Sequence, residues 1–228
     1  MTVEHQTFEA RLECRYLLHT PQTMDRNSLL ILTLHGYSSN PEAMLRLTAG
    51  VVGQGHVIAA LEGPNQQYVS AGLPNKDSVA GYNWGIGAHW GSAVRLHHQM
   101  VLKVLGDLRA RFGMGSERCL LMGFSQPVGL NYRFAGTHPG EVRGILGICG
   151  GVPRDWEEEK YARVDAAVLH IARDKDEFYP VETVERFPER LRKRASDVEF
   201  RLLEGGHRFP SKAGPIVQTW MGRVFGHG

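Results

Sequence analysis

Leu-Met-Gly-Phe-Ser-Gln-Pro-Val-Gly, residues 121 to 129, follows an apolar run and places Ser125 on a turn two residues after Gly123. In the pattern Gly-x-Ser-x-Gly, a serine lies on a sharp turn from a strand into a helix, and its oxygen stands clear of the backbone. Gly123 and Ser125 fit this pattern, whereas Pro127 stands where the second glycine would be. A Gly-x-Ser sequence occurs in many proteins, so the rest of the chain decides whether Ser125 is reactive.

The rest of the chain alternates short apolar runs with helical periodicity. The apolar runs at residues 29–34 and 57–61 indicate strands covered on both faces. Further strands are predicted at residues 118–123, 142–149, 166–171 and 198–203. Helices are predicted at residues 41–52, with Asn40 as N-cap and Pro41 first in the helix, and at 92–112, 127–138, 181–195 with an interruption near Pro188, and 213–225. This alternation predicts an α/β fold with a mostly parallel central sheet and helices on both faces.

Two segments depart from the alternation. In residues 8–18, one face carries the side chains of Phe8, Ala10, Leu12, Cys14 and Tyr16, which predicts an antiparallel edge strand or half of a hairpin. Residues 62–91 are rich in Gly, Asn, Gln and Pro and show no clear period. A long ordered loop of this kind is either functional or a surface excursion.

Composition limits the class of protein. The chain has 228 residues, 42% of them hydrophobic, so we expect one domain over residues 1–228. Lys and Arg number 26 against 24 Asp and Glu, without a long block of like charges, which argues against a nucleic-acid partner. The polar N-terminus has no signal-peptide features, and no apolar run approaches the roughly 20 residues that span a bilayer. We expect a cytoplasmic protein without stable membrane association, in which Cys14, Cys119 and Cys149 are buried free thiols.

A catalytic serine needs a base, because its hydroxyl is a poor nucleophile at neutral pH, and the base needs an orienting partner. His207 lies in Glu-Gly-Gly-His-Arg-Phe-Pro, a glycine-rich loop directly after a predicted strand. Of the eleven histidines, it alone combines a post-strand position, two preceding glycines and a place downstream of Ser125. We therefore predict that His207 is the base.

Three carboxylates, Asp174, Asp176 and Glu177, follow another predicted strand and include the candidate orienting acid. Carboxylates after strands also serve as caps, so the role is open among them at this point. Serine, acid and histidine then appear in that order along the chain, each on a turn at the carboxyl end of a strand. Open α/β sheets place their functional sites at this edge.

An acyl-transfer site also needs donors aimed at the developing oxyanion. The backbone N–H of Gln126 directly follows the serine, and a second donor is the N–H of Tyr37 in Leu-His-Gly-Tyr-Ser-Ser-Asn, residues 34–40. Gly36 would let the backbone turn inward there. His35 is expected to be a structural residue of that loop and not a second base.

Four motifs carry a resemblance: Leu-His-Gly at 34–36, Gly-Phe-Ser-Gln at 123–126, the Asp176-x-x-x-Pro180 spacing, and Gly-His at 206–207 with Pro210 shortly after. Together they resemble the α/β-hydrolase fold and, more narrowly, the phospholipase/carboxylesterase family, which includes acyl-protein thioesterases and small bacterial esterases. The similarity in order and spacing extends over residues 28–225. It favours Asp176 as the acid, with Asp174 as the alternative, and implies a Ser-His-Asp esterase with a compact core, little or no cap domain, and no cofactor or metal.

The expected function is that of a serine carboxylesterase acting on short- to medium-chain, small-molecule esters, with Trp84, Phe178 and Phe209 lining an acyl pocket. A thioesterase or lysophospholipase with the same residues is the enzymatic alternative. Pro127 replaces the glycine usual in the family, and its ring disfavours the helical conformation for Gln126, so a catalytically weak binding protein is the alternative from another class. Related small hydrolases often pair, which makes a homodimer a further expectation.

Overall fold

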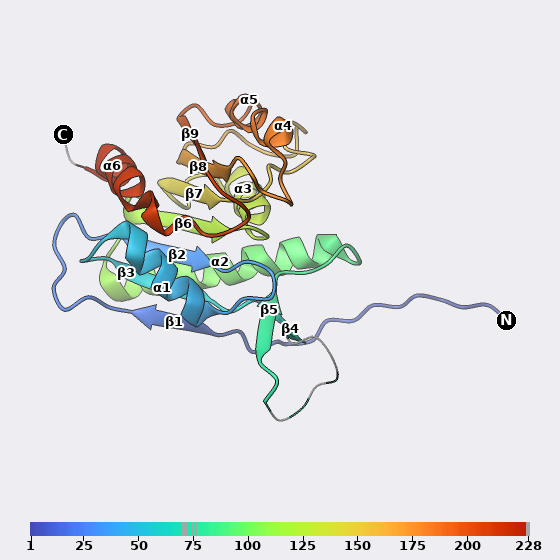
Figure 1. The fold of residues 1–228 in the computed structure, drawn as a ribbon. Helices are drawn as coiled ribbons and strands as arrows, with labels where there is room; N and C mark the ends of the chain where they lie inside the picture. The colour runs from blue at the N-terminus through green and yellow to red at the C-terminus, as the bar shows by residue number, and fades with distance from the viewer. Residues whose placement is uncertain (70–72, 74, 76, 227–228) are drawn as a thin grey trace.

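A parallel β-sheet forms the centre of the protein in the computed structural model, which describes residues 1–69, 73, 75 and 77–226. Among these residues, seven strands join in the order β1-β3-β2-β6-β7-β8-β9. Only β1 runs antiparallel to its neighbour, β3, and the other pairings are parallel. The predicted α/β fold is confirmed, with helices on both faces of the sheet (Figure 1).

The strands and helices have the following bounds. The strands are β1 (Tyr16–His19), β2 (Leu30–Leu34), β3 (Val57–Leu61), β4 (Asn65–Tyr68), β5 (Ala80–Asn83), β6 (Cys119–Phe124), β7 (Gly144–Ile148), β8 (Ala167–Arg173) and β9 (Val198–Leu203). The helices are α1 (Pro41–Val52), α2 (Trp90–Phe112), α3 (Val128–Thr137), α4 (Val181–Val184), α5 (Phe187–Arg192) and α6 (Gly214–Phe225). Single 3-10 turns occur at Ser116–Arg118 and Ser211–Ala213. None of the described helices has the length and apolarity to cross a membrane.

The predicted core elements agree closely with the observed ones because their sequence signals are strong. Asn40 caps α1 by accepting a hydrogen bond from the Ala43 N–H at 2.8 Å. The predicted helix over residues 181–195 is split into α4 and α5, next to Pro188. In β2, Leu30, Leu32 and Leu34 face one side of the sheet and Ile31 the other, as a strand buried on both faces requires.

Each face of the sheet has its own hydrophobic core. Helices α2, α3, α4 and α5 cover one face, where Leu105 and Phe134 are fully buried. Helices α1 and α6 cover the other, where Met44 and Trp220 are at most 1% exposed. The two layers hold the sheet rigid, and the loops at the carboxyl ends of its parallel strands are positioned by that rigidity.

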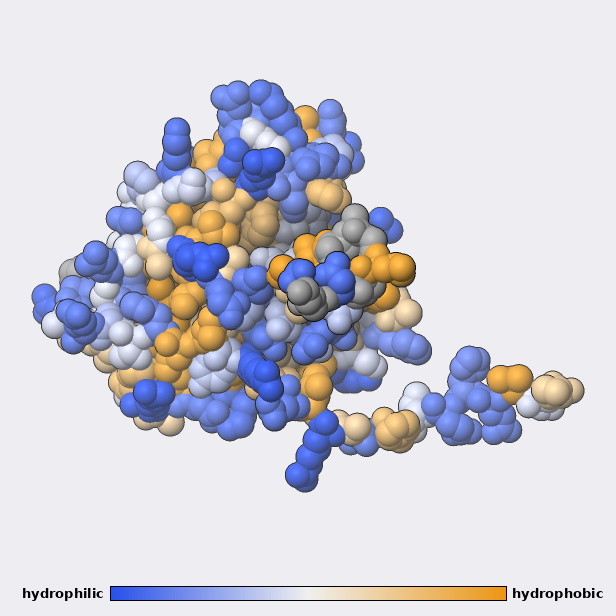
Figure 2. Space-filling model, turned by 60° about the horizontal axis from the view of Figure 1, so that its bottom comes forward, coloured by the Kyte–Doolittle hydropathy of each residue, from blue (hydrophilic) through white to orange (hydrophobic). Residues whose placement is uncertain are grey.

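The prediction for residues 8–18 is wrong in its extent. An antiparallel edge strand is present, but it covers only Tyr16–His19, and residues 1–15 contain no strand. Leu12 and Cys14 are exposed, so Cys14 is a free thiol but not a buried one. Alternation alone does not make a strand: within the part of the chain that the structure describes, no strand pairs with residues 1–14. Residues 1–15, which we call the N-terminal arm, project from the body in both views (Figure 1, Figure 2).

The described part of residues 62–91 contains two strands that the sequence does not indicate. Strands β4 and β5 pair antiparallel as a small hairpin, from Asn65 opposite Asn83 to Tyr68 opposite Ala80. The polar sequence of β4, Asn-Gln-Gln-Tyr, conceals the strand, because it lacks an apolar alternation and begins with Asn, a weak strand former. The part of the prediction that falls on residues 70–72, 74 and 76 lies outside the described residues.

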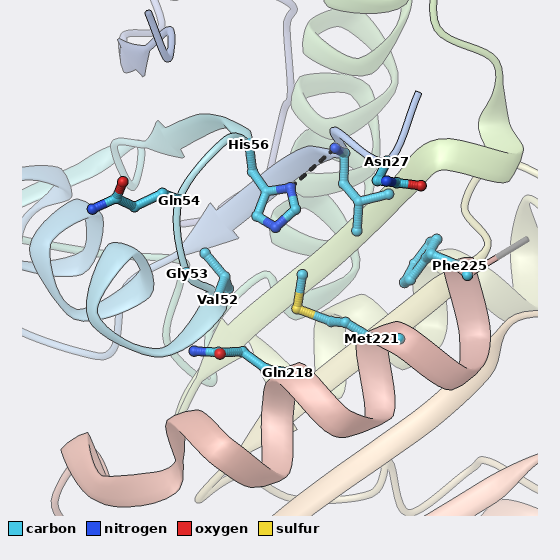
Figure 3. A pocket seen from close by; sticks show the side chains of 11 residues that line it. Asn27, Val52, Gly53, Gln54, His56, Gln218, Met221 and Phe225 are labelled. Atoms are coloured by element: carbon cyan, nitrogen blue, oxygen red, sulfur yellow. Dashed lines mark hydrogen bonds between the residues drawn. The ribbon is translucent and has the colours of Figure 1, made fainter. Parts of the chain in front are cut away.

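A cavity of about 360 Å³, shown in Figure 3, lies at the amino ends of β2 and β3. Its lining includes Val52, Gln218 and Met221, and His56, whose Nδ1 accepts a hydrogen bond from the Leu29 N–H at 3.2 Å. The strands are parallel and Ser125 follows the carboxyl end of β6, so this cavity opens at the opposite end of the sheet from Ser125.

Candidate active site

Ser125 lies on the turn between β6 and α3, as the sequence predicts. Its φ is +63°, in the left-handed region that side chains other than glycine rarely adopt. Two backbone hydrogen bonds hold the turn: the Ser125 N–H donates to the carbonyl of Ile148 at 2.8 Å, and the Val128 N–H donates to the carbonyl of Ser125 at 3.2 Å. Strained residues of this kind persist where the surroundings fix them, and they cluster at functional sites.

Two glycines make room for the turn. A Cβ on Gly123 would lie 2.8 Å from the amide nitrogen of Asn131 on α3. A Cβ on Gly150 would lie 2.6 Å from the carbonyl oxygen of Ser125 and would clash with the side chain of Val128. Gly123 is part of the predicted motif, but Gly150 is not. Its only sequence signal is its position directly after a buried strand.

The predicted serine, histidine and aspartate meet in one hydrogen-bonded chain. The Ser125 Oγ lies 2.8 Å from His207 Nε2, and His207 Nδ1 lies 2.8 Å from Asp176 Oδ2. An ionised carboxylate only accepts hydrogen bonds, so the His207 proton sits on Nδ1, and Nε2 accepts from the serine hydroxyl. These residues are 82 and 31 positions apart in sequence and come from three different loops.

The geometry distinguishes Asp176 from Asp174. The Asp176 side chain is buried, and its other oxygen, Oδ1, accepts from the backbone N–H groups of Phe178 and Tyr179 at 2.9 and 3.0 Å. Asp174 Oδ1 instead accepts from the Gly205 N–H at 2.8 Å, and so fixes the loop before His207. Asp176 is thus the carboxylate beside the imidazole, and Asp174 is a loop cap.

Glu177 holds the backbone of the histidine. Its Oε2 accepts from the His207 N–H at 3.0 Å, and this hydrogen bond lowers the pKa of the Glu177 carboxyl. On the other side, the Phe124 ring stacks on the imidazole with a centroid distance of 5.4 Å. The sequence places Glu177 near the site but gives no signal for this contact, because it depends on the folded path of two loops.

The two expected oxyanion donors lie on loops that contact each other. A Cβ on Gly36 would lie 3.3 Å from the Ser125 Cβ, so the loop that carries Tyr37 passes directly beside the serine. Among the hydrogen bonds of the described residues, none uses the backbone N–H of Tyr37 or Gln126. Two backbone donors without a protein acceptor therefore flank the serine turn, an arrangement suited to an oxyanion.

The Gln126 side chain is a structural element that the sequence analysis missed. Its Oε1 accepts from the Trp84 N–H at 2.9 Å, and its Nε2 donates to the carbonyl of Gly85 at 2.6 Å. The residue after the serine is thereby tied to the segment that follows β5. A glutamine is needed for this role, because the contact requires one acceptor and one donor on the same planar group.

His35 is structural, as predicted. It is fully buried, its Nε2 accepts from the Gly63 N–H at 3.0 Å, and its Nδ1 donates to the carbonyl of Gly36 at 2.8 Å. Burial lowers the pKa of its imidazole, which therefore stays neutral near pH 7. The ring fixes the loop that precedes Tyr37.

Pro127 fits the turn without strain. Its φ is −75° and its ψ −9°, and proline prefers such a φ, while its carbonyl accepts from the Asn131 N–H at 2.8 Å. It occupies the N-cap position of α3, where the absence of an N–H leaves no helical hydrogen bond unmade. Its Cγ would lie 3.4 Å from a Cβ on Gly123, an ordinary van der Waals distance.

The predicted aromatic residues occupy different environments. Trp84 is 1% exposed and its Nε1 donates to the carbonyl of His35 at 2.8 Å, so the prediction that it lines a pocket is wrong: the ring is part of the core. Phe178 is 69% exposed, and its ring meets the imidazole of His207 edge-on at 4.7 Å. Phe209 packs against Phe124 at 5.7 Å. Phe178 is the one of the three that borders the reactive residues and faces solvent.

The chemistry of the site rests on oxygen and nitrogen groups. Burial, and next the charge of Asp176, raise the pKa of the nearby Cys149 to about 12, so this thiol is neutral and a poor nucleophile. Among the described residues, no cluster of three His, Cys, Asp or Glu side chains is arranged to hold a metal ion. The groups that the hydrogen-bonded chain joins are the hydroxyl of Ser125, the imidazole of His207 and the carboxylate of Asp176.

Comparison with known proteins identifies the fold. No protein-family model and no curated protein matches the sequence. Solved structures do match. The esterase PE8 has 21% sequence identity and a TM-score of 0.72, and the match covers 93% of this chain and 100% of PE8. The Bacillus cereus carboxylesterase has 15% identity and a TM-score of 0.73, and the match covers 93% of this chain and 95% of that one. Arabidopsis thaliana SOBER1 is similar as well, with 16% identity and a TM-score of 0.66, and the match covers 86% of this chain and 99% of SOBER1. The matched structures are covered almost to their full length. The protein therefore has the α/β-hydrolase fold.

Proposed function

We propose that this protein is a serine carboxylesterase of the phospholipase/carboxylesterase type. The observation that carries the proposal is the continuous hydrogen-bonded chain from Asp176 through His207 to Ser125, with both distances at 2.8 Å. A serine, an imidazole and a buried carboxylate in this order are the parts of a nucleophilic acyl-transfer site. The likeness in fold to an esterase and a carboxylesterase supports the same reaction class.

In the proposed mechanism, the Ser125 oxygen attacks the acyl carbonyl as His207 Nε2 takes its proton. The carboxylate of Asp176 keeps the imidazole oriented and stabilises the positive charge that forms on it. The N–H groups of Tyr37 and Gln126 stabilise the oxyanion. His207 then returns the proton to the departing alcohol, and water, activated by the same imidazole, hydrolyses the acyl-enzyme.

The surface around the serine favours small soluble esters. Phe178 and Tyr37 are exposed, and both belong to loops that contact the reactive residues. They offer apolar surface to a short or medium acyl chain. A thioester would meet the same groups, because only the leaving atom differs.

The test is hydrolysis of a series of p-nitrophenyl esters of increasing acyl length. Wild-type protein should show an optimum at short or medium chains, and Ser125→Ala should reduce kcat to the background while circular dichroism shows an intact fold. Turnover retained by the folded Ser125→Ala variant would refute the mechanism. An optimum at long chains would refute the proposed substrate class alone.

A further inference from the structure

The N-terminal arm leaves an apolar face uncovered. In residues 8–16, every second side chain is apolar or small, and the observed strand β1 uses only the last of them, Tyr16. Phe8 is 91% exposed and Leu12 is 55% exposed. An alternating segment of this kind matches a strand that lacks its partner.

The neighbouring sheet edge is also free. Strand β1 stands at the end of the sheet and pairs with β3 on its inner side only, and the pairing reaches back to Arg15, whose carbonyl accepts from the Glu62 N–H at 3.0 Å. The outer edge of β1 has no neighbouring strand among the described residues. Such an edge can accept another extended chain, whose main-chain groups complete the ladder.

The charged residues of one arm are complementary to those of a second, identical arm. Glu9, Arg11, Glu13 and Arg15 alternate on the face opposite the apolar one. If two arms pair antiparallel with Leu12 opposite Leu12, every one of these charges faces its opposite: Glu9 faces Arg15, and Arg11 faces Glu13. Opposite charges directly across an antiparallel pair stabilise it. Within one chain, the Arg15 guanidinium forms an ion pair with Glu13 at 2.9 Å and also lies near the charge of Glu62. The Arg15–Glu13 pair is exposed and is of the kind that adds little stability.

The same charges exclude the adjacent registers. A shift of two residues in one direction places Arg11 opposite Arg11 and Glu9 opposite Glu13. A shift of two in the other direction places Glu13 opposite Glu13 and Arg11 opposite Arg15. Like charges directly opposite each other destabilise a pair, and a shift of one residue would place apolar side chains on the charged face. The register centred on Leu12 is thus specified by the sequence.

An apolar groove is available for the partner's side chains. It has a volume of about 590 Å³ and lies between the arm and the flank of α2, where Leu96, Met100 and Val104 contribute to it. The arm lines its other side with Leu12 and Tyr16. In the centred register, Phe8 of a second copy lies opposite Tyr16, at the position where it can enter this groove.

We propose that two copies of this chain associate through antiparallel pairing of residues 8–16, the second half of the N-terminal arm together with Tyr16, about a two-fold axis at Leu12. The interface is isologous, because each copy offers the same segment to the other. The pairing extends the central sheet from β1 of one copy into the arm of the next and covers Phe8 and Leu12. It involves none of the residues assigned to ester hydrolysis, so it stands independently of the proposed function.

The first experiment swaps the charges of the arm. An acidic variant, Arg11→Glu with Arg15→Glu, and a basic variant, Glu9→Arg with Glu13→Arg, each put like charges opposite each other. Sedimentation equilibrium should show wild-type dimers and a dissociation constant raised about tenfold or more in either variant. An equimolar mixture of the two variants should restore a dimer that contains one copy of each. The matched control is Arg26→Glu with Arg46→Glu, two exposed cations outside the arm, which should dimerise like wild type.

A wild-type protein that stays monomeric would overturn the proposal. A dimer that persists equally in both charge variants would place the interface elsewhere, and a mixture that fails to pair would refute the charge complementarity.

The second experiment tests the register. Residues directly opposite in an antiparallel pair have Cα atoms about 4.5 to 5.5 Å apart, within the range that a disulfide spans. On a Cys14→Ser background, Leu12→Cys should therefore form a disulfide-linked dimer on mild oxidation, seen on a non-reducing gel. Gln6→Cys on the same background is the control, because Gln6 lies opposite Leu18 and not opposite itself. Equal cross-linking of both variants would refute the register.

Discussion

Replacing Asp176 by asparagine tests the proposed catalytic chain with almost no change in side-chain shape. Asp176 Oδ1 accepts from two backbone N–H groups, those of Phe178 and Tyr179, and Oδ2 accepts from His207 Nδ1. An asparagine has one oxygen and one NH₂. Its oxygen must stay on the two N–H groups, since an NH₂ there would leave three donors facing one another.

The NH₂ of the introduced asparagine would then point at His207 Nδ1 and donate to it. The imidazole proton moves to Nε2, where it blocks the nitrogen that should accept the Ser125 proton. In triads of this kind the wrong tautomer reduces kcat about 10⁴-fold, which corresponds to about 5.4 kcal/mol of transition-state stabilisation. The assay is p-nitrophenyl ester hydrolysis, with a thermal melt to confirm that the variant is folded.

The matched control is Asp174→Asn, which changes a carboxylate two positions away. The Asp174 side chain accepts from the Gly205 N–H, and an asparagine oxygen can accept the same hydrogen bond. Its kcat should stay within about tenfold of wild type, since the imidazole tautomer is untouched. A kcat for Asp176→Asn within about tenfold of wild type, or a larger loss in Asp174→Asn, would refute the assigned order of residues.

The same structure makes three further predictions. Pro127→Gly should leave kcat unchanged and lower the free energy of unfolding by about 0.4 to 1 kcal/mol, because the proline already has its preferred φ and restricts the unfolded chain. If the variant is faster in the ester assay, the proline distorts the oxyanion site. Gly36→Ala should lower kcat by up to about 10²-fold, because the new Cβ, 3.1 Å from the Phe124 ring, displaces the loop that carries the Tyr37 N–H. An unchanged kcat with an intact thermal melt would count against the Tyr37 N–H as an oxyanion donor. Burial lowers the pKa of His97 and of His170 from 6.5 to about 3, so the unfolded chain binds more protons below pH 6.5 and stability should fall there by about 1.4 kcal/mol per pH unit for each histidine. Urea denaturation at several pH values measures this slope, and His170→Phe should remove one histidine's share of it; an identical slope in the variant would contradict the prediction.

Local signals predict most strands of the central sheet and place Ser125 and His207 on turns that the structure brings together. The strands that strong apolar runs predict begin and end within a few residues of the observed bounds. The turn after each strand is where α/β sheets place their sites. Ser125 and His207 stand directly on such turns. The preference for Asp176 over Asp174 came from the resemblance to the α/β-hydrolase fold, in which the spacing to Pro180 recurs, since both carboxylates follow the same strand.

The sequence could not predict contacts that arise only when distant loops meet. The hydrogen bond from the His207 N–H to Glu177 and the anchoring of the Gln126 side chain to Gly85 join segments 30 and 41 residues apart. The prediction that Trp84 lines an acyl pocket fails for the same reason, because only the folded arrangement of the loops places its ring in the core beside His35.

The most direct test of the central claim is reaction of the folded protein with a fluorophosphonate, followed by peptide mapping by mass spectrometry. Such a reagent phosphonylates a serine whose hydroxyl is activated by a base. If Ser125 is the nucleophile of a working triad, the wild-type protein should carry one adduct, on Ser125, and lose its esterase activity in step with labelling. His207→Ala should label far more slowly, because the hydroxyl then has no acceptor for its proton. No adduct on Ser125 in folded protein, or labelling at an unchanged rate in His207→Ala, would contradict the account.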